Sequence, residues 1–278
     1  MLTRHTRCAA VLGSPISHSL SPALHRAAYL ALGLSDWSYG AHEVQEPALR
    51  GFVAALGPQW AGLSLTMPLK EAAFEVADEV SDLAREVGAV NTLVRRPDGG
   101  WSADNTDVYG VSQALREAGC AHVAGAVVLG SGATARSVVA ALATLGCAKV
   151  TFAVRSAARR ETLDQARRAG LEVDVVGLDR LGDRLGEARL VVSTLPANAL
   201  TGRVLGGGSA GVDHLLLDVV YAGWPTPLAR TFQEAGASVV SGLEVLVHQA
   251  AEQVHLMTGL FGPVEAMRAA GLAAMASR

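Results

Sequence analysis

The hexapeptide GSGATA at residues 130–135 leaves this 278-residue chain few folds to choose from. An apolar run typical of a strand, AVVL at 126–129, comes directly before it, and a segment of helical character extends to Leu145 after it. Residues 149–154 then predict a second strand. A strand, a glycine turn, a helix and a strand make one βαβ unit, which requires a parallel sheet.

The small residues of the hexapeptide each have a physical reason to be small. Gly130 permits the tight turn, Gly132 lets the backbone approach a pyrophosphate, and Ala135 allows the helix to pack closely on the strand. The N-terminus of the following helix adds N–H groups and the positive end of the helix dipole. The pattern therefore predicts a dinucleotide-binding domain of the Rossmann type.

The residues after the next strand indicate which dinucleotide is bound. A domain that binds NAD places Asp or Glu about 20 residues beyond the glycines, where the carboxylate holds the ribose 2′-hydroxyl. This chain instead has Arg155 and Ser156, followed by Arg159 and Arg160. A carboxylate would repel a 2′-phosphate, whereas a guanidinium pairs with it, so the sequence predicts NADP as the cofactor.

Strands and helices alternate along the rest of the chain, which predicts an α/β protein. In the first part of the chain, strands are expected at 9–12 and 62–66, and a hairpin at 89–95 and 100–103. Helices are expected after Ser21 as N-cap, ending at Gly33, and at Lys70–Val80 and Thr106–Ala118. Further strands are expected at 171–176, 190–193, 215–219 and 238–240, and a helical stretch at 243–275.

Composition excludes several classes of protein. Half of the residues are apolar and 18% are charged, as in a globular chain of two domains. The net charge of −3 provides no global positive field for nucleic acid or for an anionic membrane. No apolar run approaches the ~20 residues that span a bilayer. Three widely spaced cysteines (Cys8, Cys120 and Cys147) make a poor disulfide framework and predict free thiols in the cytoplasm.

Four polar clusters follow or end predicted strands in the first part of the chain. They are SHSLS at 17–21, SLTMPLK at 64–70, NT at 91–92 and NTD at 105–107. Ligands of open α/β sheets bind outside the carboxyl ends of the strands, so these clusters are candidates for a site. Ser19 and Ser21 could hold a carboxylate, and Lys70 with Asp107 could form a proton-transfer pair. No cluster of His and Cys has metal-ligand spacing, so no metal is expected.

Taken together, the motifs resemble those of the shikimate dehydrogenase family. The resemblance is carried by GSPISHSLSPALH at 13–25, SLTMPLK at 64–70, GAVNT at 88–92, DNTD at 104–107, GSGATA at 130–135, VVYAGWPTPL at 219–228 and SGLEVLVHQA at 241–250. These segments stand in the order and spacing of that family and cover nearly the whole chain.

The resemblance implies a two-domain α/β fold. Residues 1–105 with 241–278 would form the substrate-binding domain, and residues 106–240 the Rossmann-type NADP-binding domain. The C-terminal helices would pack back on the substrate domain. The implied activity is the reversible reduction of 3-dehydroshikimate to shikimate with NADPH, in aromatic amino-acid biosynthesis. The partners are then small molecules. A homodimer is one possible oligomeric state.

Site residues are also implied by matching the family's motifs. Lys70 and Asp107 would be the catalytic pair, with the Lys70 ammonium giving a proton to the substrate oxygen. The substrate would contact Ser19, Ser21, Thr66, Asn91, Tyr221 and Gln249. NADP would contact Gly130, Ser131, Gly132, Ala133, Thr134, Ala135, Arg155, Ser156, Arg159 and Gly242.

Some positions depart from the family's pattern and keep alternatives open. Ser64 stands where the family commonly has Asn, and Arg26 stands where Asn is usual. Ser64 lies on the strand that leads to Thr66 and Lys70, so the fine substrate preference depends on it. A quinate or aminoshikimate dehydrogenase of the same fold is one alternative. A non-catalytic NADP-responsive binding protein is another, and an intact Lys70–Asp107 pair argues against it.

Overall fold

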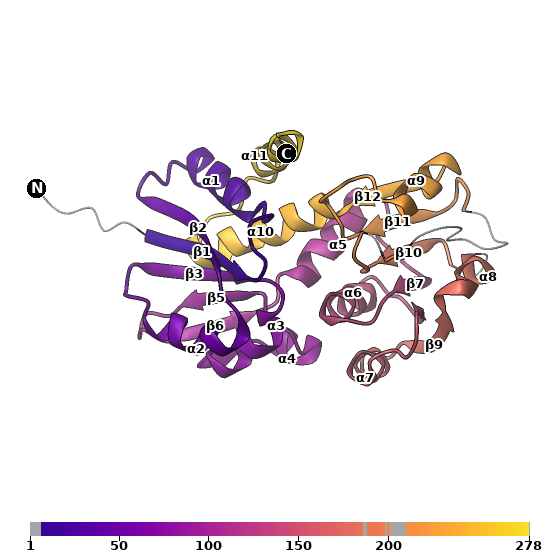
Figure 1. The fold of residues 1–278 in the computed structure, drawn as a ribbon, viewed down its shortest axis with the longest axis horizontal. Helices are drawn as coiled ribbons and strands as arrows, with labels where there is room; N and C mark the ends of the chain where they lie inside the picture. Colours follow the sequence, from indigo (N-terminus) through magenta and orange to yellow (C-terminus); the bar gives the residue numbers. More distant parts are fainter. Residues whose placement is uncertain (1–6, 186–187, 198, 201–209, 278) are drawn as a thin grey trace, which may run out of the picture. The chain divides into compact units, whose positions relative to one another are not determined.

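The computed structural model describes residues 7–185, 188–197, 199–200 and 210–277, and its contacts divide the chain into two compact units. Unit 1 comprises Met1–Gly110 and Leu246–Arg278, and unit 2 comprises Val111–Val245. The chain passes between the units inside helix α5 (Asp107–Glu117) and again inside helix α10 (Gly242–Thr258). Two separated stretches of sequence, indigo to purple and yellow in Figure 1, therefore build unit 1.

Unit 1 contains a mixed sheet whose described strands run in the order β2-β1-β3-β5-β6-β4. Their bounds are β1 Arg7–Gly13, β2 Trp37–Glu43, β3 Trp60–Leu65, β4 Glu79–Val80, β5 Thr92–Arg95 and β6 Trp101–Asp104. Strand β1 pairs in parallel with β2 and β3, whereas β5 is antiparallel to both β3 and β6. The β5–β6 hairpin is the one predicted from the sequence, and Gly99 in its turn has a φ of +91°.

Helices cover this sheet and complete its core. They are α1 Ser21–Ala31, α2 Glu46–Ala54, α3 Leu69–Ala72, α4 Asp82–Val87 and α11 Val264–Ala276, with a 3₁₀ turn at Ala73–Glu75. Helix α11 packs against α1, as Figure 1 shows, although more than 200 residues separate them in the sequence. Leu12, Leu63 and Leu93 are fully buried where the strands meet the helices. Removing this apolar surface from water is the main stabilising term.

Two sequence expectations for unit 1 are wrong. The helix expected at Lys70–Val80 ends at Ala72, because Asp78 pairs with Trp101: the Asp78 N–H donates to the Trp101 carbonyl, and the Trp101 N–H donates to Asp78 Oδ2. This pairing with β6 makes residues 79–80 a strand. Helix α1 begins at Ser21 itself with Leu20 as its N-cap, so Ser21 is not the cap residue.

Unit 2 contains a sheet whose described strands are all parallel and run in the order β12-β11-β10-β7-β8-β9. Their bounds are β7 Gly125–Leu129, β8 Lys149–Val154, β9 Glu172–Gly177, β10 Leu190–Ser193, β11 Leu215–Asp218 and β12 Ser238–Ser241. This is the Rossmann order, in which the first and fourth strands lie side by side and ligands bind where the winding reverses. Here that point lies between β7 and β10.

The helices of unit 2 lie on both faces of this sheet. They are α6 Ala133–Thr144, α7 Arg160–Arg168, α8 Leu181–Leu185 and α9 Pro227–Glu234, with a 3₁₀ turn at Leu178–Arg180. Figure 1 shows α6 and α7 on one side of the strands and α8 and α9 on the other. The central strands are buried on both faces, which explains why AVVL and LVVS read as continuous apolar runs in the sequence. The predicted α/β fold with a Rossmann-type unit is confirmed.

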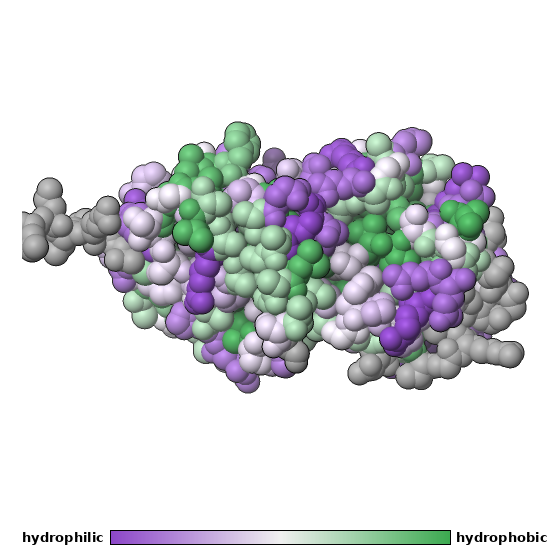
Figure 2. Space-filling view, turned by 90° about the horizontal axis from the view of Figure 1, so that it is seen from above, coloured by the Kyte–Doolittle hydropathy of each residue, from purple (hydrophilic) through white to green (hydrophobic). Residues whose placement is uncertain are grey.

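Among the described residues, most of the large exposed apolar side chains belong to unit 1. Leu30 in α1 is 85% exposed, Phe261 between α10 and α11 is 83% exposed, and Leu272 in α11 is 55% exposed. In Figure 2, hydrophobic residues gather over helices α1 and α11. No described helix has both the length and the apolarity needed to cross a membrane.

Candidate active site

Lys70 and Asp107 form an ion pair in unit 1. Lys70 lies in α3, five residues after β3 ends at Leu65, and Asp107 begins α5, three residues after β6 ends at Asp104. Lys70 Nζ lies 2.5 Å from Asp107 Oδ2, and the two side chains are only 16% and 13% exposed. Because water screens a pair this enclosed only weakly, the mutual attraction is stronger than that of a surface pair. The structure thus brings together the two residues that the sequence predicts as a proton-transfer pair.

The sheet explains why these residues meet at one edge. Strands β1, β3 and β6 point the same way, so the residues after them gather at the carboxyl edge. Strand β5 runs in the opposite direction, so Asn91, which comes before it, lies at that same edge. This is the edge where open α/β sheets bind ligands.

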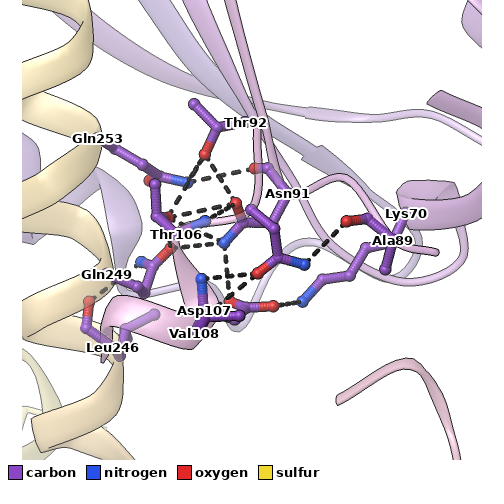
Figure 3. A network of polar contacts seen from close by, with 11 residues as sticks. Lys70, Ala89, Asn91, Thr92, Thr106, Asp107, Val108, Leu246, Gln249 and Gln253 are labelled. Atoms are coloured by element: carbon purple, nitrogen blue, oxygen red, sulfur yellow. Dashed lines mark hydrogen bonds and ion pairs between the residues drawn. The ribbon is translucent and has the colours of Figure 1, made fainter. Parts of the chain in front are cut away.

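Asn91 holds the Asp107 carboxylate from the protein side, and Asn105 holds the Asp107 backbone. Asn91 Nδ2 donates to Asp107 Oδ1 at 2.8 Å, while Oδ2 of the same carboxylate faces Lys70 (Figure 3). Asn105 Oδ1 accepts from the Asp107 N–H at 3.1 Å, and its Nδ2 donates to the Ala89 carbonyl at 2.8 Å. Each carboxylate oxygen therefore has its own partner, and the side chain has one orientation.

Gln249 brings helix α10 into this network. Its Oε1 accepts from Asn91 Nδ2 at 3.3 Å and from the Thr106 hydroxyl at 3.4 Å, and its Nε2 donates to the Leu246 carbonyl. Gln249 is 6% exposed, so water reaches its amide poorly and these protein groups are its main hydrogen-bond partners. Lys70, Asn91, Asp107 and Gln249 thus form one hydrogen-bonded group, although they come from three distant parts of the sequence.

Ser19, Ser21 and Thr66 lie near the same edge but outside this hydrogen-bonded group. The Ser21 N–H donates to Ser19 Oγ at 3.3 Å, which turns the two serines together at the start of α1. Thr66 is anchored by its N–H, which donates to the Leu12 carbonyl at 2.9 Å. A Cβ on Gly13 would lie 2.4 Å from Thr66 Cγ2, so this glycine lets the two loops approach each other.

The glycine loop lies at the point in unit 2 where the winding reverses. Gly130 has a φ of +94°, and a Cβ there would lie 2.7 Å from Thr194 Oγ1, just beyond β10. Gly132 differs, because a Cβ there would meet nothing within 4 Å. Packing against the described residues does not require that glycine, whereas a ligand that approaches the backbone would. Gly132 is the N-cap of α6 and contributes no side-chain bond, so the helix N-terminus is open to an anion.

Arg155, Ser156 and Arg159 follow β8, the strand next to β7, and all three are exposed. The loop that carries them is tied to the glycine loop: the Arg159 N–H donates to Ser131 Oγ at 3.0 Å, and Thr162 Oγ1 donates to the Ser131 carbonyl at 2.7 Å. No acidic residue occurs between 155 and 160. The exposed guanidinium groups therefore offer positive charge next to the glycine loop.

Tyr221 and Gly242 follow the last two strands of unit 2. Tyr221 is part of a loop braced by the buried Asp218, which accepts from the Thr226 hydroxyl at 2.7 Å. Burial raises the pKa of Asp218. A Cβ on Gly242 would lie 2.0 Å from the Val219 carbonyl oxygen. Close packing of the backbone therefore already explains why residue 242 is a glycine.

Sequence reasoning missed Gln253 and Tyr39, and it singled out Ser64 only as a departure from the family's pattern; the three are hydrogen-bonded behind this group. A signal for Gln253 was present: it follows Gln249 by four residues and so shares its helical face. Tyr39 gave no such signal, because only the pairing of β2 with β1 brings it near.

Two family models match the two stretches of sequence that build unit 1. A family model for the shikimate dehydrogenase substrate-binding domain matches residues 11–93, and one for the shikimate 5′-dehydrogenase C-terminal domain matches residues 242–270. The shikimate dehydrogenase (NADP⁺) of Symbiobacterium thermophilum is 38% identical over 283 residues, which cover 97% of this chain and 95% of that protein.

Solved structures are also similar over nearly the whole chain. The crystal structure of Mycobacterium tuberculosis shikimate dehydrogenase is 44% identical, with a TM-score of 0.87, and the match covers 96% of this chain and 99% of that one. Quinate dehydrogenase from Corynebacterium glutamicum in complex with NAD is 29% identical, with a TM-score of 0.86, over 96% of this chain and 99% of that one. The fold is therefore shared by enzymes named for two different ring acids.

Proposed function

The chain belongs to the shikimate dehydrogenase family, and we propose that it catalyses the reversible reduction of 3-dehydroshikimate to shikimate with NADPH. As a member of this family it is an NADP-dependent oxidoreductase. The observation that carries the proposal is the Lys70–Asp107 pair, with its 2.5 Å contact at the ligand-binding edge of unit 1. In the cell this reaction belongs to aromatic amino-acid biosynthesis, the chorismate pathway.

Lys70 is the proton donor in this proposal. Bound NADPH supplies the hydride to the carbonyl carbon of the substrate. The carbonyl oxygen then needs a proton, and the Lys70 ammonium both donates it and stabilises the negative charge that develops on the oxygen. In the reverse direction the Lys70 amine takes the proton from the shikimate hydroxyl.

Asp107 keeps Lys70 ready for this transfer. Its Oδ2 accepts the short hydrogen bond from Lys70, and Asn91 fixes the other oxygen. The carboxylate favours the charged lysine and opposes the desolvation that would favour the neutral amine. We further assign Asp107 a hydrogen bond to a substrate hydroxyl.

The remaining residues at this edge would bind and orient the ring acid. Ser19 and Ser21, held together at the start of α1, are assigned to the substrate carboxylate. Thr66, Asn91 and Gln249 offer hydroxyl and amide groups to the ring hydroxyls. Tyr221 is assigned to the wall of the substrate site.

The glycine loop and the arginines after β8 are assigned to NADP. Residues Gly130, Ser131, Gly132, Ala133, Thr134 and Ala135 would carry the pyrophosphate, with Gly132 facing open space and the start of α6 offering its N–H groups. Arg155, Ser156 and Arg159 would hold the 2′-phosphate. Gly242 would contact the cofactor through its backbone.

The test is a turnover assay with the purified protein. Shikimate and NADP⁺ are mixed with the enzyme, and the absorbance of the reduced cofactor is followed. We expect turnover with shikimate and NADP⁺, and little with NAD⁺. If shikimate gives no turnover with either cofactor, the proposed function is wrong.

A panel of ring acids separates the alternatives. Quinate and aminoshikimate are compared with shikimate, each with NADP⁺ and with NAD⁺. A higher kcat/KM for quinate would make the chain a quinate dehydrogenase, as the likeness to the Corynebacterium glutamicum enzyme allows. Tight NADP⁺ binding without turnover of any ring acid would favour a binding protein instead.

We also expect the enzyme to act in the cytoplasm, where its three cysteines, none of which is part of a disulfide in the structure, stay reduced. A homodimer is a further proposal, and the exposed Leu30, Phe261 and Leu272 of unit 1 offer apolar surface for a second copy. Light scattering during size exclusion gives the mass, and L272E should shift a dimer to monomer. A monomeric mass for the unchanged protein would contradict the dimer.

A further inference from the structure

Unit 1 buries three polar side chains behind the Lys70–Asp107 pair that the proposed reaction does not use. They are Tyr39 in β2, Ser64 in β3 and Gln253 in α10, which are 2%, 4% and 1% exposed. Burying polar groups costs free energy unless each of them finds a hydrogen-bond partner. The bonds that these three side chains make lead towards the candidate active site.

The hydrogen bonds of this cluster run in one direction. The Tyr39 hydroxyl donates to Ser64 Oγ at 2.6 Å, and the Ser64 hydroxyl donates to Gln253 Oε1 at 2.7 Å. At the other end of the same amide, Gln253 Nε2 donates to Thr92 Oγ1 at 2.9 Å and to the Asn91 carbonyl at 3.2 Å. The Thr92 hydroxyl donates in turn to Asn91 Oδ1 at 2.8 Å.

Asn91 connects these hydrogen bonds to the Asp107 carboxylate. Its Oδ1 accepts from the Thr92 hydroxyl and from the Thr106 N–H, which lies 2.8 Å away and can only donate (Figure 3). Its Nδ2 therefore faces Asp107 Oδ1. If the amide turned over, its oxygen would repel the carboxylate, and Asp107 would rotate away from Lys70.

Tyr39, at the other end of this series of hydrogen bonds, is held firmly by its neighbours. The Tyr39 ring stacks on the ring of His25 with 3.8 Å between the centroids and 15° between the planes. Burial also raises the pKa of Tyr39, so its hydroxyl keeps the proton with which it donates to Ser64. Because successive hydrogen bonds polarise one another, the run acts as a unit.

We propose that Gln253 is a positioning residue, which fixes Asp107 against Lys70 through Thr92 and Asn91, while Ser64 and Tyr39 fix the orientation of the Gln253 amide. This inference rests on the proposed function, since it assigns Gln253 a role in that proton transfer. The Ser64 hydroxyl both accepts from Tyr39 and donates to Gln253. Gln253 itself touches neither Lys70 nor Asp107.

The test compares Q253L with a matched control. Q165L also removes a buried glutamine, 1% exposed and bonded to the Arg136 carbonyl, but in unit 2. We expect Q253L to lower kcat for shikimate oxidation by about 10²-fold, because a misplaced catalytic group costs that much. The KM for NADP⁺ should change less than twofold, and Q165L should keep a normal kcat. A smaller loss is expected for Y39F, which keeps the ring and removes only the first donor.

A double variant separates this role from a general structural one. If Gln253 acts through the pair, Q253L should lower the residual turnover of K70A no further, because the two changes remove the same step. Multiplied losses in the double variant, or a normal kcat in folded Q253L, would overturn the inference and leave the proposed function intact. Normal turnover of K70A itself would overturn both. If Q253L does not fold, S64A gives the same comparison, with a lowered kcat expected and a normal one contradicting the proposal.

Discussion

The Lys70 ammonium has one described protein partner, the Asp107 carboxylate, and the residue-scale predictions begin with it. K70A should lower kcat by a factor on the order of 10²–10⁴, the usual contribution of a positioned acid–base group. NADP⁺ affinity and the unfolding temperature should change little. Steady-state rates with shikimate measure the effect, and K149A is the control, because Lys149 pairs with Glu172 on the surface of unit 2. Near-normal turnover of K70A would show that Lys70 is not the proton donor.

Arg155 tests the choice of cofactor at the level of one side chain. It is exposed directly after β8, with no carboxylate among its neighbours in sequence up to residue 160. R155A should weaken NADP⁺ binding by about tenfold or more, since a charged hydrogen bond to phosphate contributes about 1.5–3 kcal/mol. Binding of NAD⁺, which lacks the 2′-phosphate, should hardly change. Equal losses for the two cofactors, measured by calorimetry, would show that Arg155 does not hold the 2′-phosphate.

The sequence predicts the catalytic roles of Lys70 and Asp107 but not the buried contacts of Gln253 and Ser64, and the difference has a physical reason. Lys70 and Asp107 have residue types whose chemistry can be recognised locally, and each follows a recognisable strand. Gln253 and Ser64 have common polar side chains, and only the fold shows that they share a buried hydrogen bond. Their role depends on contacts between β3 and α10, 189 residues apart, which no local pattern encodes.

At the scale of elements, the two glycines assigned to NADP should respond differently to the same substitution. A Cβ on Gly242 would lie 2.0 Å from a backbone oxygen, so G242A forces β12 and α10 to shift. Overpacking of this kind costs about 1–3 kcal/mol, which should lower the unfolding temperature. Gly132 has open space around it, so G132A should leave the unfolding temperature nearly unchanged and weaken NADP⁺ binding.

Thermal unfolding and NADP⁺ titration of both variants check this contrast. A normal unfolding temperature for G242A would mean that the backbone relaxes without cost. Normal NADP⁺ affinity in G132A would mean that the cofactor does not approach this part of the loop. The two outcomes are independent, because one concerns packing inside unit 2 and the other concerns its ligand.

Elements with a periodic pattern or a strong turn signal were predictable, and the others were not. The Pro97–Gly100 turn and the two runs beside it specify the β5–β6 hairpin locally. Strand β2 lacks a clean alternation because most of its residues are exposed or half-buried. The segment 73–80 has a helical pattern, but Asp78 finds its partners on β6, and this long-range pairing outweighs the local preference.

At the scale of the whole molecule, the order of strands in unit 2 follows from the chain's βαβ pattern, whereas the make-up of unit 1 does not. Right-handed crossovers with short connections lead to the parallel Rossmann order. Unit 1 needs the last 33 residues of the chain, because α10 supplies Gln249 and α11 packs on α1. Local patterns cannot tell that the C-terminal helices belong to the first sheet, and only the resemblance to a known family gave that arrangement.

The stability of unit 1 should depend on pH through His25, which is fully buried between α1 and the sheet. Burial lowers the pKa of His25 to about 4, although its hydrogen bond to the Ser21 carbonyl acts the other way. In the unfolded chain the pKa of histidine is about 6.5. Between these values the unfolded state binds a proton that the folded state does not. Unfolding is therefore favoured as the pH falls through this range.

The resulting prediction concerns the slope of stability against pH. His25 contributes a loss of at most about 1.4 kcal/mol per pH unit between pH 6.5 and 4, and nothing above pH 7. H25F keeps a ring against Tyr39 but cannot titrate, so its stability should fall less steeply over the same range. Urea unfolding followed by tryptophan fluorescence measures this in unit 1, which holds Trp37, Trp60 and Trp101. The plateau above pH 7 is the internal reference, since His25 is then neutral in both states. Parallel slopes for the two proteins would mean that His25 takes up its proton without unfolding.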